Sequence, residues 1–136
     1  MIAELAQDLL TKLQAIPALA TSCGLDLLGD MPDPGAAKIT PPAAWIIPKK
    51  AINPRDRAEA VPATIITAEL EFVVGLYLPT SSQIATQLPL LESAIKAIQG
   101  TTSPSGQRWF WRDLERAATN PGVMVYAITF SVNAGF

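Results

Sequence analysis

The feature that most constrains the fold is a strict alternation of apolar residues over residues 64–79. Successive side chains of a β-strand point to opposite faces, so a period of two gathers one set of residues on one face. The apolar set is Ile66, Ala68, Leu70, Phe72, Val74, Leu76 and Leu78. The opposite face carries Glu69, Glu71, Gly75 and Tyr77. The pattern predicts a strand longer than the usual roughly 3 to 10 residues, packed on one face and partly hydrated on the other.

The composition fits one domain with a surplus of apolar residues. A chain of 136 residues is long enough to bury one ordinary hydrophobic core. Hydrophobic residues make up 49% of it and charged residues only 16%, against a typical charged share of about 25%. We therefore expect part of the apolar surplus to be buried between subunits. The alternative is a well-buried monomer rich in alanine.

Charge and rare residue types disfavour several functions. The net charge of −2 and the pI of 5.0 provide no basic field for a nucleic-acid backbone. Cys23 is the sole cysteine, which excludes an internal disulfide and a cysteine-based zinc site and agrees with assembly in a reducing cytoplasm. Histidine is absent, which removes the commonest general base and metal ligand. We predict no catalytic activity and no cofactor.

The sequence predicts neither a metal site nor a segment that targets or spans a membrane. Asp26, Asp30 and Asp33 follow one another as ligands of a hard cation would, but their run lacks the glutamate and glycine of a calcium loop. Aspartate is also a common turn residue, so we favour a turn over a metal site. The N-terminus lacks the pattern of a signal peptide, and no apolar run approaches roughly 18 residues, so we expect no membrane span.

Two amphipathic helices are predicted from apolar residues spaced three and four apart. The first ends near Pro17, and its stripe is Ile2, Leu5, Leu9, Leu13 and Ile16. The second is capped by Ser81 or Ser82 and stops at Gly100. Its stripe is Ile84, Leu88, Leu91, Ile95 and Ile98. Pro89 predicts either a kink or a start at Leu88 with the proline in the first turn.

Further strands are predicted on either side of the long one. Residues 24–29 contain a candidate short strand, and residues 43–47 read as a strand near a sheet edge, ended by Pro48. It places Trp45 and Ile47 on one face and Ala44 and Ile46 on the other. Residues 108–117 and 123–132 form a predicted hairpin around the turn at 120–122.

The hairpin opens with an aromatic run in which Trp109 and Trp111 share one side and Phe110 takes the other. Neighbouring arginines could make this a base-stacking surface. Because the chain is acidic and has no basic groove, the run favours core and interface packing instead. The complete pattern predicts an α+β domain over residues 1–136, with a mostly antiparallel sheet of four to five strands and two helices packed on one face.

Residues 49–62 lie between the predicted strand that ends at Pro48 and the long strand. They are polar, mix charges of both signs and lack hydrophobic periodicity. We predict a long loop there, since loops of this length are usually functional or disordered. The alternative is a solvated hairpin tip.

The order of elements resembles the tail terminator family of long-tailed bacteriophages, the group similar to minor tail protein U. The likeness lies in an N-terminal helix, a proline-introduced strand (PPAAWIIPKK), a polar excursion, the long strand (ITAELEFVVGLYLP), a helix ending IKAIQG and a tryptophan-bearing hairpin closing in VMVYAITFSV. The proline-rich stretch 31–42 and Pro89 depart from the pattern.

The resemblance implies a structural virion protein, assembled in the host cytoplasm, at the head-proximal end of the tail. It implies a homohexameric ring that ends polymerisation of the tail tube protein and offers a joining surface to the head-to-tail connector protein. DNA would pass through the lumen without sequence-specific binding, and no membrane is involved.

We expect contacts between subunits, or with the tube, at the polar loop and the exposed face of the long strand. The candidate residues are Lys49, Lys50, Arg55, Asp56, Arg57, Glu59, Glu69 and Glu71. Mixed charges of this kind set register between complementary surfaces. The alternatives are a head-to-tail connector or neck protein, and a small ferredoxin-like ligand-binding module; an enzyme is less favoured than either.

Overall fold

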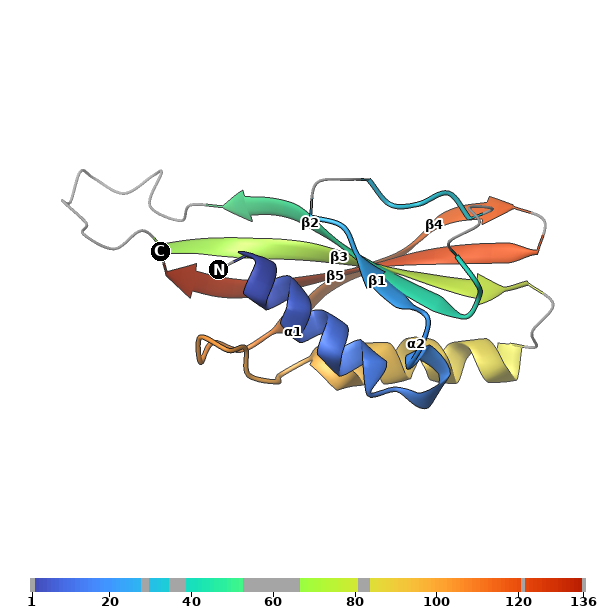
Figure 1. Ribbon diagram of the computed structural model, residues 1–136, viewed down its shortest axis with the longest axis horizontal. Coiled ribbons are helices and arrows are strands. Elements are labelled where there is room, and N and C mark those ends of the chain that lie inside the picture. The colour runs from blue at the N-terminus through green and yellow to red at the C-terminus, as the bar shows by residue number, and fades with distance from the viewer. Residues whose placement is uncertain are drawn as a thin grey trace.

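The computed structural model describes residues 2–27, 30–34, 39–52, 67–80, 84–120 and 122–135. They form a five-stranded mixed sheet with both long helices against one face (Figure 1), which confirms the expected α+β fold. The elements in order are α1 (Ile2–Gln14), the 3-10 turn η1 (Pro17–Leu19), β1 (Cys23–Leu25), β2 (Ala43–Ile52), β3 (Thr67–Pro79), α2 (Ile84–Ile98), β4 (Phe110–Asn120) and β5 (Val123–Gly135).

The strands lie in the order β1-β2-β3-β5-β4, and every pair is antiparallel except β1 with β2. The long central pair, β3 and β5, stays in register from Thr67–Gly135 to Pro79–Val123. β1 is short and covers only Ala44–Ile46 of β2. Within the described part of the chain, residues 47–52 of β2 therefore lie at one free edge of the sheet, and β4 forms the other edge.

The core lies between the helices and one face of the sheet. Alternate residues of β3 are buried there, among them Phe72, Val74 and Leu76, as the period of two predicts. The helices contribute Leu5, Leu9 and Leu13 from α1 and Leu91, Ala94 and Ile98 from α2.

Two residues of the predicted helical stripes lie outside this core: Ile2 is 40% exposed and Leu88 is 50% exposed. Ala94 joins Leu91 and Ile98 in the buried stripe. At 3.6 residues per turn, Leu88 then lies about 90° from the centre of that stripe. The apolar spacing thus predicted the helix correctly, but the predicted centre of its buried face was wrong.

Two prolines do not end the elements that contain them. α2 begins at Ile84 with Pro89 inside it, so the prediction of a start at Leu88 was wrong. β2 continues through Pro48 to Ile52, so the predicted end at Pro48 was also wrong. Ala44 and Ile46 direct their backbone groups toward β1. Pro48, two residues on, lacks an N–H on that same side, and none of the described strands pairs with β2 there.

The sheet face opposite the helices, called the outer face below, is covered around Gly75 and Tyr77. A segment before β2, residues 30–34 and Ile39, crosses it and is called the strap. Under the strap, Tyr77 is fully buried and its hydroxyl donates to the Pro32 carbonyl at 2.5 Å. Met31 occupies the space at Gly75, where a Cβ would collide with its sulfur. The expected hydration of this face is therefore wrong around Gly75 and Tyr77.

Candidate functional site: the two edges of the sheet

Four of the eight predicted interface residues are among the described residues, and these four all lie on strands. Lys49 and Lys50 belong to β2, beside an irregularity in the register between Pro48 and Lys50. The expectation that they begin a loop was wrong, because the strand continues past the proline. Glu69 and Glu71 lie on the outer face of β3, partly buried. Arg55, Asp56, Arg57 and Glu59, with the rest of the predicted loop from residue 53 on, lie outside the described residues.

The acidic pair of β3 is engaged within the subunit. Lys49 Nζ lies 3.9 Å from Glu71 Oε1, and Arg112 Nη2 lies 3.2 Å from Glu69 Oε1. Arg112, which the sequence did not nominate, also donates from Nε to Ser131 Oγ at 2.7 Å. Because such surface pairs are worth roughly 0–1 kcal/mol each, they orient the side chains more than they stabilise the fold. Lys50, by contrast, has no ion pair within the described residues.

The β4 edge carries two adjacent exposed aromatic residues, Phe110 at 40% and Trp111 at 44% exposure. Phe110 lies under the Arg112 guanidinium, 5.4 Å from its carbon to the ring centroid. The Trp111 backbone N–H donates to Gln99 Oε1 at 2.5 Å, and its indole Nε1 donates to the Asp113 carbonyl at 3.0 Å. The sequence predicted an aromatic strand here but gave no sign of which ring would stay exposed.

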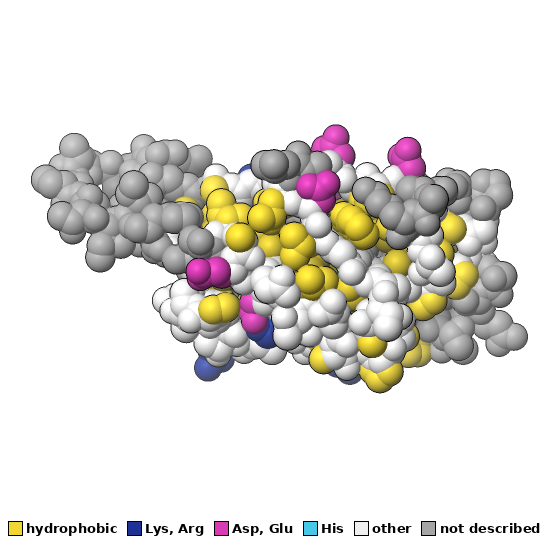
Figure 2. All heavy atoms as spheres, in the orientation of Figure 1, with side chains coloured by type: hydrophobic (Ala, Val, Ile, Leu, Met, Phe, Trp, Pro, Cys, Tyr) yellow, Lys and Arg dark blue, Asp and Glu magenta, His cyan; other side chains and the backbone are white. Residues whose placement is uncertain are grey.

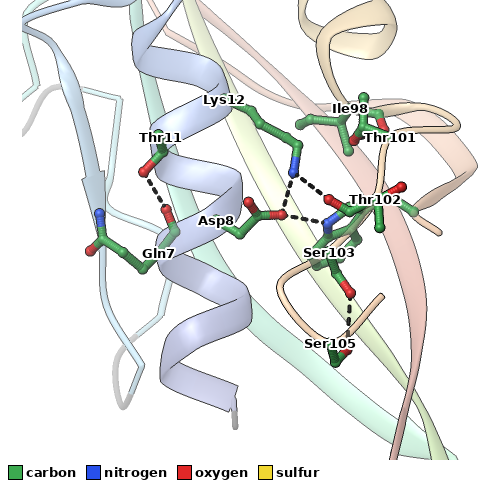
Figure 3. A network of polar contacts seen from close by, with 10 residues as sticks. Gln7, Asp8, Thr11, Lys12, Ile98, Thr101, Thr102, Ser103 and Ser105 are labelled. Carbon is green, nitrogen blue, oxygen red and sulfur yellow. Dashed lines mark hydrogen bonds and ion pairs between the residues drawn. The ribbon is translucent and has the colours of Figure 1, made fainter. Parts of the chain in front are cut away.

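The preceding tryptophan has the opposite environment. Trp109 is fully buried, lies edge-on to Phe72 with ring centroids 5.7 Å apart, and donates from Nε1 to Asp8 Oδ2 at 2.8 Å. Lys12 binds the same carboxylate and also donates to the Thr102 carbonyl at 3.1 Å (Figure 3). This network connects the loop before β4 to α1.

At the opposite edge, an open groove of about 380 Å³, solvent at its mouth included, lies between the start of α1 and β2. Figure 2 shows hydrophobic side chains gathered in a band that runs from near the N-terminal end of α1 toward the centre of the face. The lining of the groove is mostly apolar and includes two lysines. Its lining residues are Ile2, Pro48, Lys49, Lys50, Ala51, Leu70, Glu71 and Phe72. The sequence missed it because the strand was expected to end at Pro48.

The three aspartates considered as metal ligands and the single cysteine all lie among the described residues. Among them, no three acidic or cysteine side chains lie close enough together to hold a metal ion, Asp26, Asp30 and Asp33 included. Burial raises the pKa of the Cys23 thiol to about 11, and the thiol donates to the Leu19 carbonyl at 3.1 Å. Cys23 is therefore protonated at neutral pH and a poor nucleophile. None of the described helices has the length and apolarity to span a membrane.

Comparison with known proteins adds no family to this geometry. No protein-family model matches the chain, and no curated protein matches it.

Proposed function

We propose that this protein is a tail terminator: a structural subunit whose hexameric ring caps the tail tube of a long-tailed bacteriophage, ends tube polymerisation and presents the head-joining surface. The observation that carries the proposal is the pair of dissimilar open edges on opposite sides of one sheet. One edge exposes Phe110 and Trp111, and the other holds an apolar groove beside residues 47–52 of β2.

Dissimilar edges suit a closed ring. A ring requires a heterologous contact, in which one patch of a subunit meets a different patch of the next and the rotation closes. Two edges of one sheet, each with its own apolar feature, supply two such patches. The order of the elements, which resembles that of tail terminators, supports the size of the ring and its place in the virion.

The charge of the protein fits passage of DNA through such a ring. A net charge of −2 without histidine offers little attraction to a phosphate backbone. We expect the lumen to be lined by neutral or acidic residues. The partners are then further copies of this chain, the tail tube protein and the head-to-tail connector protein, with no cofactor and no reaction catalysed.

The test is molar mass by light scattering over a concentration series, with negative-stain imaging, followed by tube polymerisation with purified tail tube protein. We expect six-membered rings, alone or in the presence of tubes, and tubes that stop growing when the protein is added. A strict monomer that neither binds tubes nor changes their length would refute the proposal.

The alternative within the same class is a head-to-tail connector, which would bind portal-side rings in place of tail tubes in the same experiment. A small ligand-binding module is supported less, because such sites need several convergent polar groups. Among the described residues, the groove supplies only Lys49, Lys50 and Glu71.

A further inference from the structure

The first half of β4, at one edge of the described sheet, turns part of its backbone away from β5. In an antiparallel pair, residues that exchange both hydrogen bonds alternate with residues whose backbone groups point away from the partner. The Ala44 N–H of β2 points toward β1 and so away from β3. The same alternation, followed through the registers of β3 and β5, makes the residues of β4 opposite Phe130 and Ile128 point outward. These two residues are Trp111 and Leu114.

The chain just before β4 pairs with the segment that follows α2. The Trp109 N–H donates to the Thr101 carbonyl at 2.9 Å, and the Gly100 N–H donates to the Trp109 carbonyl at 2.9 Å. Lys12 of α1 donates to the carbonyl of the next residue, Thr102, at 3.1 Å. Residues 100–102 therefore lie beside the start of β4 and occupy its edge there.

Beyond this segment, side chains accept the outward N–H groups. The Trp111 N–H donates to Gln99 Oε1 at 2.5 Å. The Leu114 N–H donates to Asp113 Oδ1 at 2.8 Å. Gln99 is within reach of β4 because it follows α2 directly, and its own N–H still donates to the Ile95 carbonyl at 2.8 Å. Consecutive outward N–H groups of this edge are thus occupied within the subunit.

We propose that Gln99 and Asp113 cap the edge of β4, so that no strand of another chain pairs with its first half and contacts at this edge are made by side chains. A strand that joins a sheet edge bonds to the outward N–H and C=O groups of that edge. To pair here, it would have to displace both side-chain acceptors. Open edges invite association of this kind, and native proteins block them with local devices.

The rest of the strand agrees with a blocked edge. The register of β4 with β5 is irregular between Trp111 and Asp113 and again between Arg116 and Ala118. Such irregularities bend a strand and interrupt the ladder that a neighbour would extend. Exposed charged side chains along the same stretch also discourage pairing. They are Arg112, Asp113, Glu115 and Arg116.

The opposite edge is blocked in a different way. Pro48 of β2 has no N–H to offer on its open side, and the register with β3 shifts between Pro48 and Lys50. An incoming strand cannot displace a proline, whereas each cap of β4 is one side chain that a substitution removes. The β4 edge is therefore the one at which the block can be tested directly.

The first experiment measures amide hydrogen exchange, resolved to single residues by NMR. We expect Gln99→Ala to lower the protection of the Trp111 N–H about fivefold, the value of one hydrogen bond, and to leave Leu114 unchanged. Asp113→Ala should do the reverse. The matched controls are Gln99→Glu and Asp113→Asn, which keep an oxygen acceptor and should keep the protection. Equal protection in all four variants and the wild type would overturn the inference.

The second experiment asks whether the caps prevent pairing. The variant Gln99→Ala/Asp113→Ala, the alanine pair, is compared with the control pair Gln99→Glu/Asp113→Asn by light scattering and thioflavin T fluorescence over a concentration series. The control pair gains one negative charge and loses another, so its net charge stays at −2. Asp113→Asn alone loses the same charge as the alanine pair and separates the effect of charge from that of the caps.

We expect the alanine pair to form heavier species with raised dye fluorescence at concentrations where the control pair, Asp113→Asn and the wild type keep the same mass. An alanine pair that associates no more than the control pair would overturn the inference. Circular dichroism checks that each variant is folded. If the alanine pair does not fold, exchange in the single variants decides.

The caps and the proposed ring are tested by different comparisons. A wild-type chain that stays monomeric and does not bind tail tubes refutes the ring and leaves the caps. An alanine pair that keeps the mass of the wild type refutes the caps and leaves the ring.

Discussion

On the outer face of the sheet, the half around Tyr77, called the closed half, is covered by the strap. No described segment covers the half around Glu69, called the open half, which is crossed by charged pairs. The closed half gathers Ile39, Ala43, Tyr77 and Val125 into an apolar cluster. The open half joins Lys49 to Glu71 and Arg112 to Glu69. One half of this face is thus organised by burial and the other by charged pairs. We expect the buried half to contribute most to the free energy of unfolding, and the charged pairs to set only the orientation of their own side chains.

The largest expected effect is that of Tyr77→Ala. Removing a fully buried ring should cost about 3–5 kcal/mol of unfolding free energy, as large aromatic-to-alanine changes do. Urea unfolding would measure it. Tyr77→Phe is the matched control, because it keeps the ring and removes only the hydrogen bond to Pro32, at a cost of about 1 kcal/mol. A smaller loss in Tyr77→Ala than in Arg112→Ala would reverse the comparison.

Gly75→Val should come next, at about 1–3 kcal/mol, because the added side chain collides with Met31. Adding Met31→Ala to this variant should recover part of the loss, since the double variant removes the atoms in collision. Thermal unfolding of both variants and the double variant measures the coupling. Strictly additive losses would show that the strap does not occupy the space at Gly75.

The phenol of Tyr77 should make the closed half sensitive to alkali. Burial, with a smaller contribution from the Asp33 carboxylate, raises the pKa of Tyr77 from 10.0 to about 12. The folded state then holds the proton more tightly than the unfolded state. The resulting stability is complete below pH 10 and is lost as the pH rises toward 12. Unfolding midpoints of the wild type should fall more steeply over this interval than those of Tyr77→Phe; parallel curves would contradict the shift.

The smallest effect belongs to the open half. Glu69→Gln should cost less than about 1 kcal/mol, because the pair with Arg112 is half exposed and screened by salt. The difference from the wild type should shrink further at high salt. A loss of several kcal/mol, unchanged by salt, would mean that the charged half is as important to stability as the closed half.

The sequence predicted what local periodicity controls. The alternation of the long strand, both helices, the final hairpin and the α+β class all follow from residues close in the chain. The strap did not, because Met31 and Tyr77 meet only when a proline-rich segment without periodicity folds back onto Gly75. The extension of β2 past Pro48 depends on β1 stopping opposite Ile46, which leaves Pro48 without a partner strand among the described residues on that side. The pairing of Arg112 with Glu69 depends on strand order. Neither is encoded within one segment.

The position of β5 between β3 and the edge strand β4 has a consequence for the order of folding. β5 pairs with β3 across a long stretch of chain, Thr67 lying opposite Gly135, while its partner β4 lies immediately before it. The local hairpin of β4 and β5 can form quickly. The pairing of β3 with β5 must wait until the chain between these two strands closes into a loop, and the entropic cost of that closure slows folding. Until β5 docks, β3 has an unpaired side, so the newly made subunit is most prone to aggregation in that interval.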